Sequence, residues 1–295
     1  MTRPISFLSD FGHADEFVGV VHGVIRRISG DIEVIDVTHG VPRGNVRAGA
    51  LALTRAIQFL PNGVVLAVVD PGVGGERRAI AAETAWGYFV GPDNGLLAPA
   101  VAIVGGATRI VSLEAEEFRL PRSGPTFDGR DVFAPAAAVL ASGEAGLGDL
   151  GPEVPPGSLT PLLLPLVEHI DGTVAGEVWW VDRFGNAETN VSPGDLEAIG
   201  VHPGGRVTLR VGLASHELEW RVDYGSGDDP LVHVDSSGMI AVAVPGGRAD
   251  ETLNMPEGTA VVFGPATPSG RGTRVEIEPR TKNQEPRLKA DPGDW

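Results

Sequence analysis

The stretch VVDPGVGGERRAI, from Val68 to Ile80, joins the end of an apolar run to an acid, a glycine-rich turn and two arginines. The run from Val64 to Val69 has the composition of a buried strand, and Asp70 follows it directly. Ligands collect at the carboxyl ends of strands in open α/β sheets. A carboxylate there, with Arg77 brought back by the turn, makes a fixed charged pair that can hold a small polar reactant. Taken alone, the stretch fits a surface turn with solvated charges equally well.

Apolar runs on both sides of this stretch alternate between strand-like and helical spacing. The alternation predicts βαβ units and an N-terminal α/β domain with a largely parallel sheet, covering residues 1–150. A pair of strands is expected around Trp86-Gly87. We expect the remaining strands at Ile5–Leu8, Ile32–Val37 and Val64–Val69, and helices at about Asp15–Ile28, Arg47–Phe59 and Val132–Ala141.

The composition changes near Gly151. The segment from Gly151 to Pro165 carries five prolines, so residues 151–167 are interpreted as a linker. Short strands with turn residues between them predict a small all-β barrel over residues 168–279. The polar tail, residues 280–295, is expected to be disordered. The expected strands are Gly172–Val181, Arg206–Val211, His216–Val222, Leu231–Val234, Met239–Val244, Thr259–Val262 and Thr273–Ile277.

Composition excludes several functional classes. The chain has 295 residues, of which 42% are hydrophobic, enough for sizeable cores in two domains. A net charge of -16 argues against nucleic acid as a partner. The absence of cysteine excludes disulfides and thiolate metal sites. With neither a signal peptide nor an apolar run long enough for a membrane helix, we expect a cytoplasmic protein that does not bind membranes.

Acidic residues recur in glycine-flanked loops after apolar runs. Asp10, Asp70, Asp93-Asn94 and the loop from Asp128 to Asp131 share this position, so they are expected to line one edge of the sheet. A second loop, from Val181 to Asn186, places an acid, an aromatic ring and an amide together, which suits a heteroaromatic base with an attached sugar. Ordinary Asx turns are the competing interpretation of all these loops.

Other well-known functional motifs are incomplete in this sequence. The glycines from Gly72 to Gly75 lack the spacing of a dinucleotide fingerprint and the lysine of a P-loop. His13, His22 and His39 lack a recognisable metal-ligand spacing, and His22 is expected to pack or to lie at the surface. We therefore expect a carboxylate-based site with no metal and no cofactor.

Six motifs together resemble the S-adenosyl-L-methionine (SAM) hydroxide adenosyltransferases, also called SAM hydrolases, which are related to the SAM-dependent fluorinase and chlorinase. The resemblance runs from about Ile5 to Val262. It implies an α/β domain, a β-barrel domain and a homotrimer with SAM bound where subunits meet. The implied reaction is attack of water or hydroxide on ribose C5′, giving adenosine and L-methionine. The motifs are SDFG from Ser9, VTHG from Val37, the stretch Val68–Ile80, GPDNGLL from Gly91, PTFDGRDVFAPAAA from Pro125 and VDRFGNAETNV from Val181.

The resemblance also assigns roles to positions of this chain. Asp70 and Arg77 match two members of the family's water-handling set, and Asp128 stands where the family usually has the histidine of that set. Pro245 and Ser237 also depart from residues common in relatives. The other matched positions contact the substrate: the ribose and reaction centre at Asp10, Thr126 and Phe127, the methionine part at Asp15, Asp182 and Ser236, and the adenine at Phe184 and Asn186.

Two other functions remain open. One is a SAM-dependent halogenase, although a carboxylate at Asp70 would repel a desolvated halide. The other is a non-catalytic adenosine- or SAM-binding protein in which Asp128 has ended turnover. Analysis of the reaction products distinguishes the SAM hydrolase, the halogenase and the binding protein.

Overall fold

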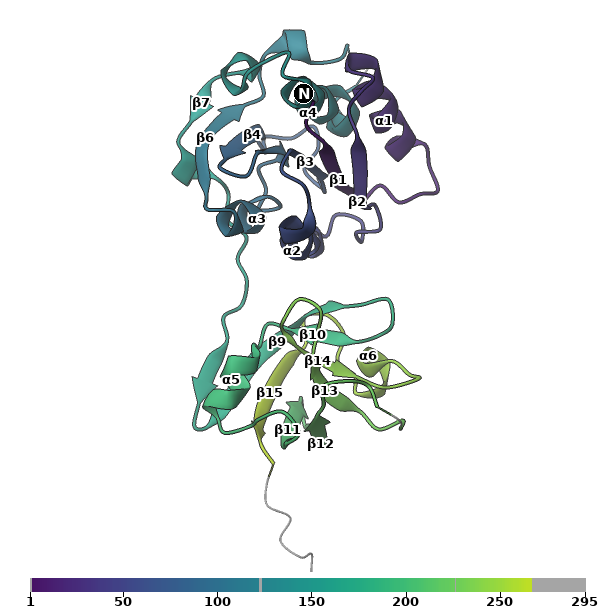
Figure 1. The fold of residues 1–295 in the computed structure, drawn as a ribbon, viewed down its shortest axis with the longest axis vertical. Coiled ribbons are helices and arrows are strands. Elements are labelled where there is room, and N and C mark those ends of the chain that lie inside the picture. Colours follow the sequence, from purple (N-terminus) through teal and green to yellow (C-terminus); the bar gives the residue numbers. More distant parts are fainter. Residues whose placement is uncertain (1, 122–123, 226, 267–295) are drawn as a thin grey trace, which may run out of the picture.

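The structure is a computed structural model, which describes residues 2–121, 124–225 and 227–266. Figure 1 shows an α/β domain connected to a β-barrel domain by a single crossing of the chain. Within these ranges no helix combines the length and apolar content needed to cross a membrane.

The first domain is built on a seven-stranded sheet in the order β2-β1-β3-β5-β4-β6-β7. Strands β2, β1, β3 and β5 run parallel, and strands β4, β6 and β7 extend the sheet by antiparallel pairing. The strands are β1 (Ile5–Ser9), β2 (Val34–Thr38), β3 (Val64–Val68), β4 (Ala79–Thr84), β5 (Tyr88–Pro92), β6 (Ala107–Ser112) and β7 (Glu153–Val154).

Helices cover both faces of this sheet, as Figure 1 shows. Helices α1 (Phe17–Ile28) and α4 (Ala134–Ser142) pack on one face, and α2 (Val46–Ala56) and α3 (Ala98–Ile103) on the other. Strand β3 feeds both cores, because side chains alternate across a strand: Leu66 belongs to the first core and Ala67 to the second. Burial on both faces explains why β3 has no polar residue.

The second domain is a closed barrel of seven strands in the order β10-β14-β13-β12-β11-β15-β9, in which β10 also pairs with β9. Trp220 and Phe263 fill its core. Strand β8 (Glu168–Ile170) adds to the outside of β9, and two short helices are α5 (Pro193–Ala198) and α6 (Ala249–Thr252). The barrel strands are β9 (Thr173–Val181), β10 (Ala187–Thr189), β11 (Arg206–Val211), β12 (Ala214–Trp220), β13 (Leu231–Val234), β14 (Ile240–Ala243) and β15 (Ala260–Pro265).

The predicted fold class, an α/β domain with a largely parallel sheet followed by a β-barrel, is confirmed. Strand β7 pairs with β6, so the first residues of the expected linker 151–167 extend the sheet of the N-terminal domain. The expected helix at Val132–Ala141 begins instead with a π-helical turn, Gly129–Phe133, which leads into α4. The expected strand Thr273–Ile277 and the tail 280–295 lie outside the described residues.

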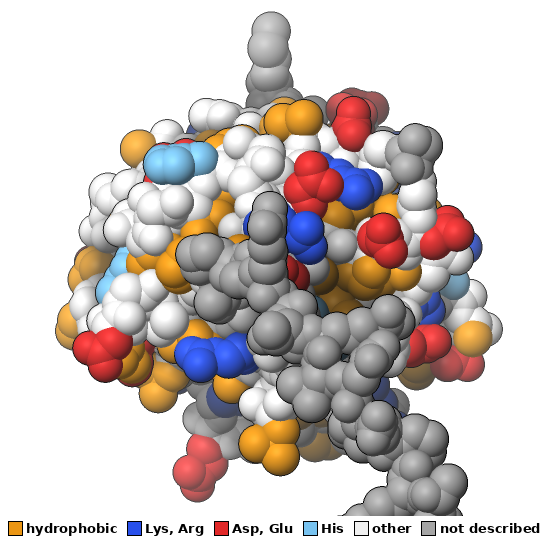
Figure 2. All heavy atoms as spheres, turned by 90° about the horizontal axis from the view of Figure 1, so that it is seen from below, with side chains coloured by type: hydrophobic (Ala, Val, Ile, Leu, Met, Phe, Trp, Pro, Cys, Tyr) orange, Lys and Arg blue, Asp and Glu red, His pale blue; other side chains and the backbone are white. Residues whose placement is uncertain are grey.

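Opposite charges are mixed on the surface of the barrel. Arg221 pairs with Glu219 at 2.9 Å, and Arg206 lies 3.7 Å from Glu217 across β11 and β12. Figure 2, which views the molecule from the barrel end, shows acidic and basic side chains interspersed on that face. Interspersed charges of both signs favour solubility.

Candidate active site

Acidic residues follow three neighbouring parallel strands of the first domain. Asp10 comes directly after β1, Asp70 two residues after β3, and Asp93 directly after β5. Because β1, β3 and β5 are adjacent and parallel, these loops lie along one edge of the sheet, as the sequence predicts. This edge is the candidate active site.

Arg77 connects two of the acids. Its Nε lies 3.0 Å from both carboxylate oxygens of Asp70, and its Nη2 lies 2.5 Å from Oδ2 of Asp70 and 2.5 Å from Oδ2 of Asp128. Only 14% of the Arg77 side chain is exposed, against 5% for Asp70 and 6% for Asp128. Its guanidinium also lies 5.5 Å from the ring centre of Phe133. A guanidinium held by two carboxylates in a shielded place is fixed in position. We call these three residues the Asp–Arg–Asp cluster.

Glycines allow the two segments of the Asp–Arg–Asp cluster to approach each other. Gly74 has φ +76°, and a Cβ there would lie 2.9 Å from the carbonyl oxygen of Pro125. The turn after Asp70 therefore packs directly on the loop before Asp128. A Cβ on Gly129 would lie 2.8 Å from the Phe11 ring, so the π-helical turn after Asp128 also depends on a glycine. Single π-helical turns of this kind occur frequently at functional sites.

The electrostatics of the Asp–Arg–Asp cluster keep Arg77 charged. Burial alone would lower the pKa of the guanidinium, but hydrogen bonds and Coulomb attraction from Asp70 and Asp128 outweigh it and raise that pKa above its ordinary value. Arg77 is thus a permanent cation that holds both acids.

Three other predicted residues lie near the loop that follows β1. Phe127 is half-buried and packs edge-on against Phe11 at 5.7 Å and Phe17 at 5.0 Å between ring centres. Thr126, the residue before it, is exposed, and so is Asp15 just before α1. Asp10 accepts a hydrogen bond from the backbone N–H of Gly44 at 2.7 Å, which fixes its carboxylate.

Not every acid at the sheet edge is available to a ligand. Asp93 pairs with Arg78 and accepts from the backbone N–H of Thr160 at 2.8 Å, so it connects β5 to the chain beyond β7. The amide of Asn94 donates to the carbonyl of Val69 at 2.9 Å. These residues act as structural ties. Asn94 also forms an Asx turn, the alternative that the sequence left open, because its Oδ1 accepts from the backbone N–H of Leu96 at 3.2 Å.

The predicted residues of the barrel lie in two turns. Asp182, in the β9–β10 loop, accepts from the backbone N–H groups of Phe184 at 2.8 Å and Asn186 at 2.9 Å, and from the Asn186 side chain at 2.7 Å. Its carboxylate therefore shapes this loop. The Phe184 ring is 76% exposed. Ser236 is exposed in the turn between β13 and β14.

A surface hollow of about 570 Å³ adjoins the β9–β10 loop. The hydroxyl of Tyr224, a residue not predicted from the sequence, accepts from the Asn186 amide at 3.3 Å. Tyr224 follows β12 in an irregular segment, so no periodic pattern marks it. The mostly apolar lining suits a flat ring. Its residues are Phe184, Asn186, Tyr224, Val244, Pro245, Gly246 and Gly247.

The two domains touch through α2 and its N-terminal cap. Arg47 lies 2.5 Å from Glu177 on β9, and Arg55 lies 3.6 Å from Glu188 on β10. Asn45, the N-cap of α2, donates to Glu257 at 3.3 Å. Among the described residues these contacts come from α2, on a face of the sheet, and not from the loops after β3 at its edge.

Glu188 makes this domain contact sensitive to pH. Burial raises the pKa of its carboxyl from an ordinary 4.5 to about 7, Arg55 lowers it only in part, and Asp235 and Asp182 raise it further. A carboxyl that binds its proton more tightly when folded contributes stability below pH 4.5, and that contribution is lost as the pH rises through 7. The loss amounts to about 3 kcal/mol.

We therefore expect Glu188→Gln to raise the free energy of unfolding at pH 8 by about 2–3 kcal/mol and to change it little at pH 5. Denaturant unfolding at both pH values measures this difference. Glu217→Gln, an exposed position on β12, is the control and is expected to show no such pH dependence. An equal effect of Glu188→Gln at both pH values would contradict the assignment.

A further cluster was missed from the sequence. His22 on α1, Asp36 on β2 and His39 just after β2 bring one ligand atom each to within 4.8 Å of one another. These side chains come together because a helix and a strand are neighbours in the fold, and no local sequence motif marks them.

The fold and the Asp–Arg–Asp cluster define a two-domain protein, in which the α/β domain carries a shielded charged cluster at its sheet edge and the barrel has a mostly apolar surface hollow. The chain belongs to the SAM hydroxide adenosyltransferase family: the family's N-terminal domain matches residues 5–151 and its C-terminal domain residues 176–262.

Individual proteins of known name or structure agree with this membership. A protein of Salinispora arenicola named (R)-S-adenosyl-L-methionine hydrolase is 45% identical over 254 residues, covering 86% of this chain and 95% of that protein. The crystal structure of an uncharacterized conserved protein from Thermotoga maritima superimposes with a TM-score of 0.82 at 36% identity, covering 88% of this chain and 99% of that one. A fluorinase of Actinopolyspora mzabensis is 28% identical, covering 88% of this chain and 97% of that protein.

Proposed function

We propose that the protein hydrolyses SAM to adenosine and L-methionine, by attack of water or hydroxide on C5′ of the ribose. The observation that carries this proposal is the Asp–Arg–Asp cluster, shielded and rigid at the sheet edge where Asp10 also lies. The hydrolase name of a relative at 45% identity supports the same reaction.

The leaving group of this reaction needs no catalytic assistance from the protein. Sulfur departs from a sulfonium as a neutral thioether, so no acid has to protonate it. The enzyme has to place the nucleophile opposite sulfur and hold the ribose. Orientation of this kind can supply several kcal/mol of barrier reduction, about 7–11 in favourable intramolecular cases.

We assign the roles as follows. Asp70 accepts a hydrogen bond or a proton from the attacking water, and Arg77 holds Asp70 in position and favours a hydroxide ion. Asp128, in place of the histidine usual in the family, gives Arg77 a second anchor at 2.5 Å. Asp10 binds the ribose hydroxyls, because an ionised carboxylate can accept from both. In the barrel, Phe184, Asn186 and Tyr224 receive the adenine.

The substrate is proposed to lie between subunits of a homotrimer. Within one chain the domain contacts run through α2, which supports a site completed by the barrel of a neighbouring subunit. Asp182, Glu188 and Asp235 lie close enough to interact, and this acidic group suits the cationic amino group of the methionine.

Mixed trimers test the shared site. Asp70→Asn impairs the α/β half, and Asn186→Ala impairs the barrel half. In a trimer that contains both variants, one interface joins an intact α/β half to an intact barrel half. We therefore expect co-expressed variants to recover roughly one third of wild-type activity per mixed trimer. Separately purified variants are the control. If mixed trimers recover no activity, the site lies within one chain.

Product analysis tests the reaction itself. Purified protein is incubated with SAM in halide-free buffer and in buffer with added chloride, and the products are separated by chromatography. Adenosine and methionine in equal amounts in both buffers support the proposal. A chlorinated nucleoside formed only with chloride identifies a halogenase. Unchanged SAM with adenosine or SAM bound to the protein identifies a binding protein.

A further inference from the structure

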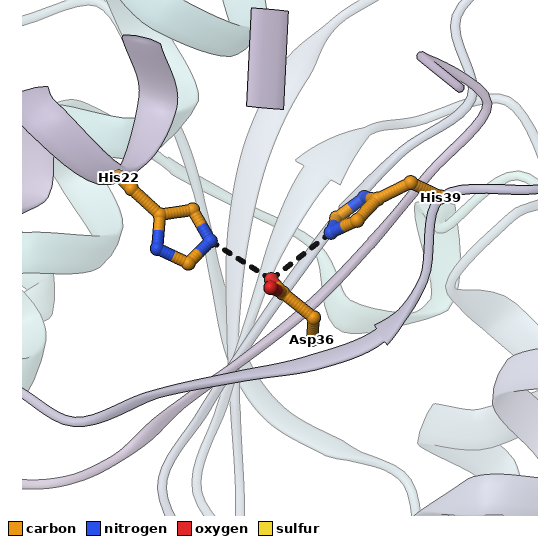
Figure 3. Close-up of side chains that lie close together, drawn as sticks. All are labelled: His22, Asp36 and His39. Carbon is orange, nitrogen blue, oxygen red and sulfur yellow. Dashed lines mark hydrogen bonds and ion pairs between the residues drawn. The ribbon is translucent and has the colours of Figure 1, made fainter. Parts of the chain in front are cut away.

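His22, Asp36 and His39 form a compact group outside the Asp–Arg–Asp cluster. The Nε2 atom of His22 lies 2.8 Å from Oδ1 of Asp36, and the Nε2 atom of His39 lies 3.0 Å from the same oxygen. Figure 3 shows both imidazoles pointing at this carboxylate, one from each side. Two imidazoles and one carboxylate make a nitrogen–oxygen ligand set that suits first-row divalent metals.

Two of the three separations between the ligand atoms are close to those found in metal sites. Zinc bonds of about 2.0–2.1 Å at tetrahedral angles place ligand atoms about 3.3 Å apart. The observed separations of 2.8 and 3.0 Å from Asp36 are close to this value, and all three ligand atoms lie within 4.8 Å of one another. The His22 side chain is partly exposed, so it has room to turn toward an ion.

His39 is oriented as a metal-binding histidine is. Its side chain is fully buried, and its Nδ1 atom lies 2.7 Å from the hydroxyl of Ser9. A hydroxyl can accept the Nδ1 proton, which leaves the Nε2 lone pair free for an ion. The ring also packs edge-on against Phe7 at 4.5 Å. This support fixes the imidazole plane before any ion binds.

The charges of the group also suit a cation. Asp36 supplies a carboxylate, and neither His22 nor His39 carries the fixed positive charge that an arginine or a lysine would. Without an ion, both imidazoles donate Nε2–H to Asp36; on binding, each proton moves to Nδ1.

We propose that His22, Asp36 and His39 form a binding site for a divalent transition-metal ion of the zinc class. The side chains of His22 and Asp36 are 31% and 45% exposed, so an ion enters from solvent and keeps open positions for water. The site is separate from the residues proposed to handle water. It is connected to the ribose-binding loop, because Ser9 precedes Asp10 and the backbone N–H of Gly12 donates to the carbonyl of His39 at 2.8 Å.

Metal titration of the untagged full-length protein tests the proposal. Zn²⁺ is followed by calorimetry and Co²⁺ by its visible absorption, whose intensity reports low coordination number. We expect one ion per chain, with the intense visible absorption of Co²⁺ at low coordination number. His22→Gln and Asp36→Asn are each expected to weaken binding at least about 100-fold, since even outer-shell partners change affinity by 10–100-fold.

Two variants act as controls. His169 lies 2.8 Å from Asp195 but has no second imidazole beside it in the described structure, so His169→Gln is expected to leave affinity unchanged. His13 lies 5.5 Å from His39 between ring centres and is exposed. Circular dichroism checks that each variant is folded. His13→Gln is also expected to leave affinity unchanged. The proposal is wrong if no ion binds, or if folded His22→Gln and Asp36→Asn bind as tightly as the wild type.

Discussion

Asp70→Asn is expected to lower the turnover number for SAM at least about 100-fold while SAM still binds. Positioned acid–base groups contribute factors of about 10²–10⁴. Asparagine keeps the shape of the side chain but replaces one acceptor oxygen by a donor and removes the charge. The binding contacts come from other residues, such as Asp10 and the β9–β10 loop. Single-turnover kinetics measure the chemical step, and calorimetry measures SAM binding.

A matched control separates this effect from a general loss of charge. Asp31→Asn makes the same chemical change at an exposed position before β2 and is expected to leave turnover unchanged. Near-normal turnover of Asp70→Asn would remove Asp70 from the mechanism. A loss of SAM binding equal to the loss of turnover would make Asp70 a binding residue instead.

Arg77→Gln is expected to cost stability as well as turnover. The substitution leaves the carboxylates of Asp70 and Asp128, which are 5% and 6% exposed, without the cation that holds both. Removing one partner of a buried ion pair costs about 3–5 kcal/mol. In a chain of this size that corresponds to a melting temperature lower by about 10 °C. Differential scanning calorimetry measures the shift.

A second variant tests the cause of that loss. In Arg77→Gln/Asp128→Asn one of the two carboxylates is neutral, so we expect the double variant to be more stable than Arg77→Gln alone. Arg109→Gln removes the exposed Arg109–Glu153 pair and is expected to change stability little. Asp128→Asn alone completes the comparison. If the stability changes of Arg77→Gln and Asp128→Asn simply add in the double variant, Arg77 and Asp128 do not interact energetically.

The fold was largely predictable because local patterns and burial agree. β3 is a continuous apolar run in the sequence, and both of its faces are buried in the structure. The helix at α1 follows from its helical spacing of apolar residues. Short elements were missed, such as α3 (Ala98–Ile103) and β10 (Ala187–Thr189), because a few residues carry too little periodicity to distinguish a helix, a strand and a loop.

Site residues could be predicted only where the interacting residues are close in the sequence or belong to a motif of a known family. Asp70 and Arg77 lie seven positions apart in one glycine turn, so their pairing can be inferred from the turn. Asp128 is 51 positions from Arg77, and only the family resemblance placed it beside that residue. His22 and Asp36, 14 positions apart, meet because α1 packs beside β2. That contact depends on tertiary packing, which the spacing of residues does not encode.

The measurement that tests the central claim most directly is turnover of SAM in water enriched in oxygen-18, followed by mass spectrometry of both products. Attack of water on C5′ transfers one oxygen to the nucleoside and breaks its bond to sulfur. We expect adenosine heavier by the mass of one label and methionine without label at early times. Unlabelled adenosine, or homoserine formed together with methylthioadenosine, would contradict attack at the ribose carbon.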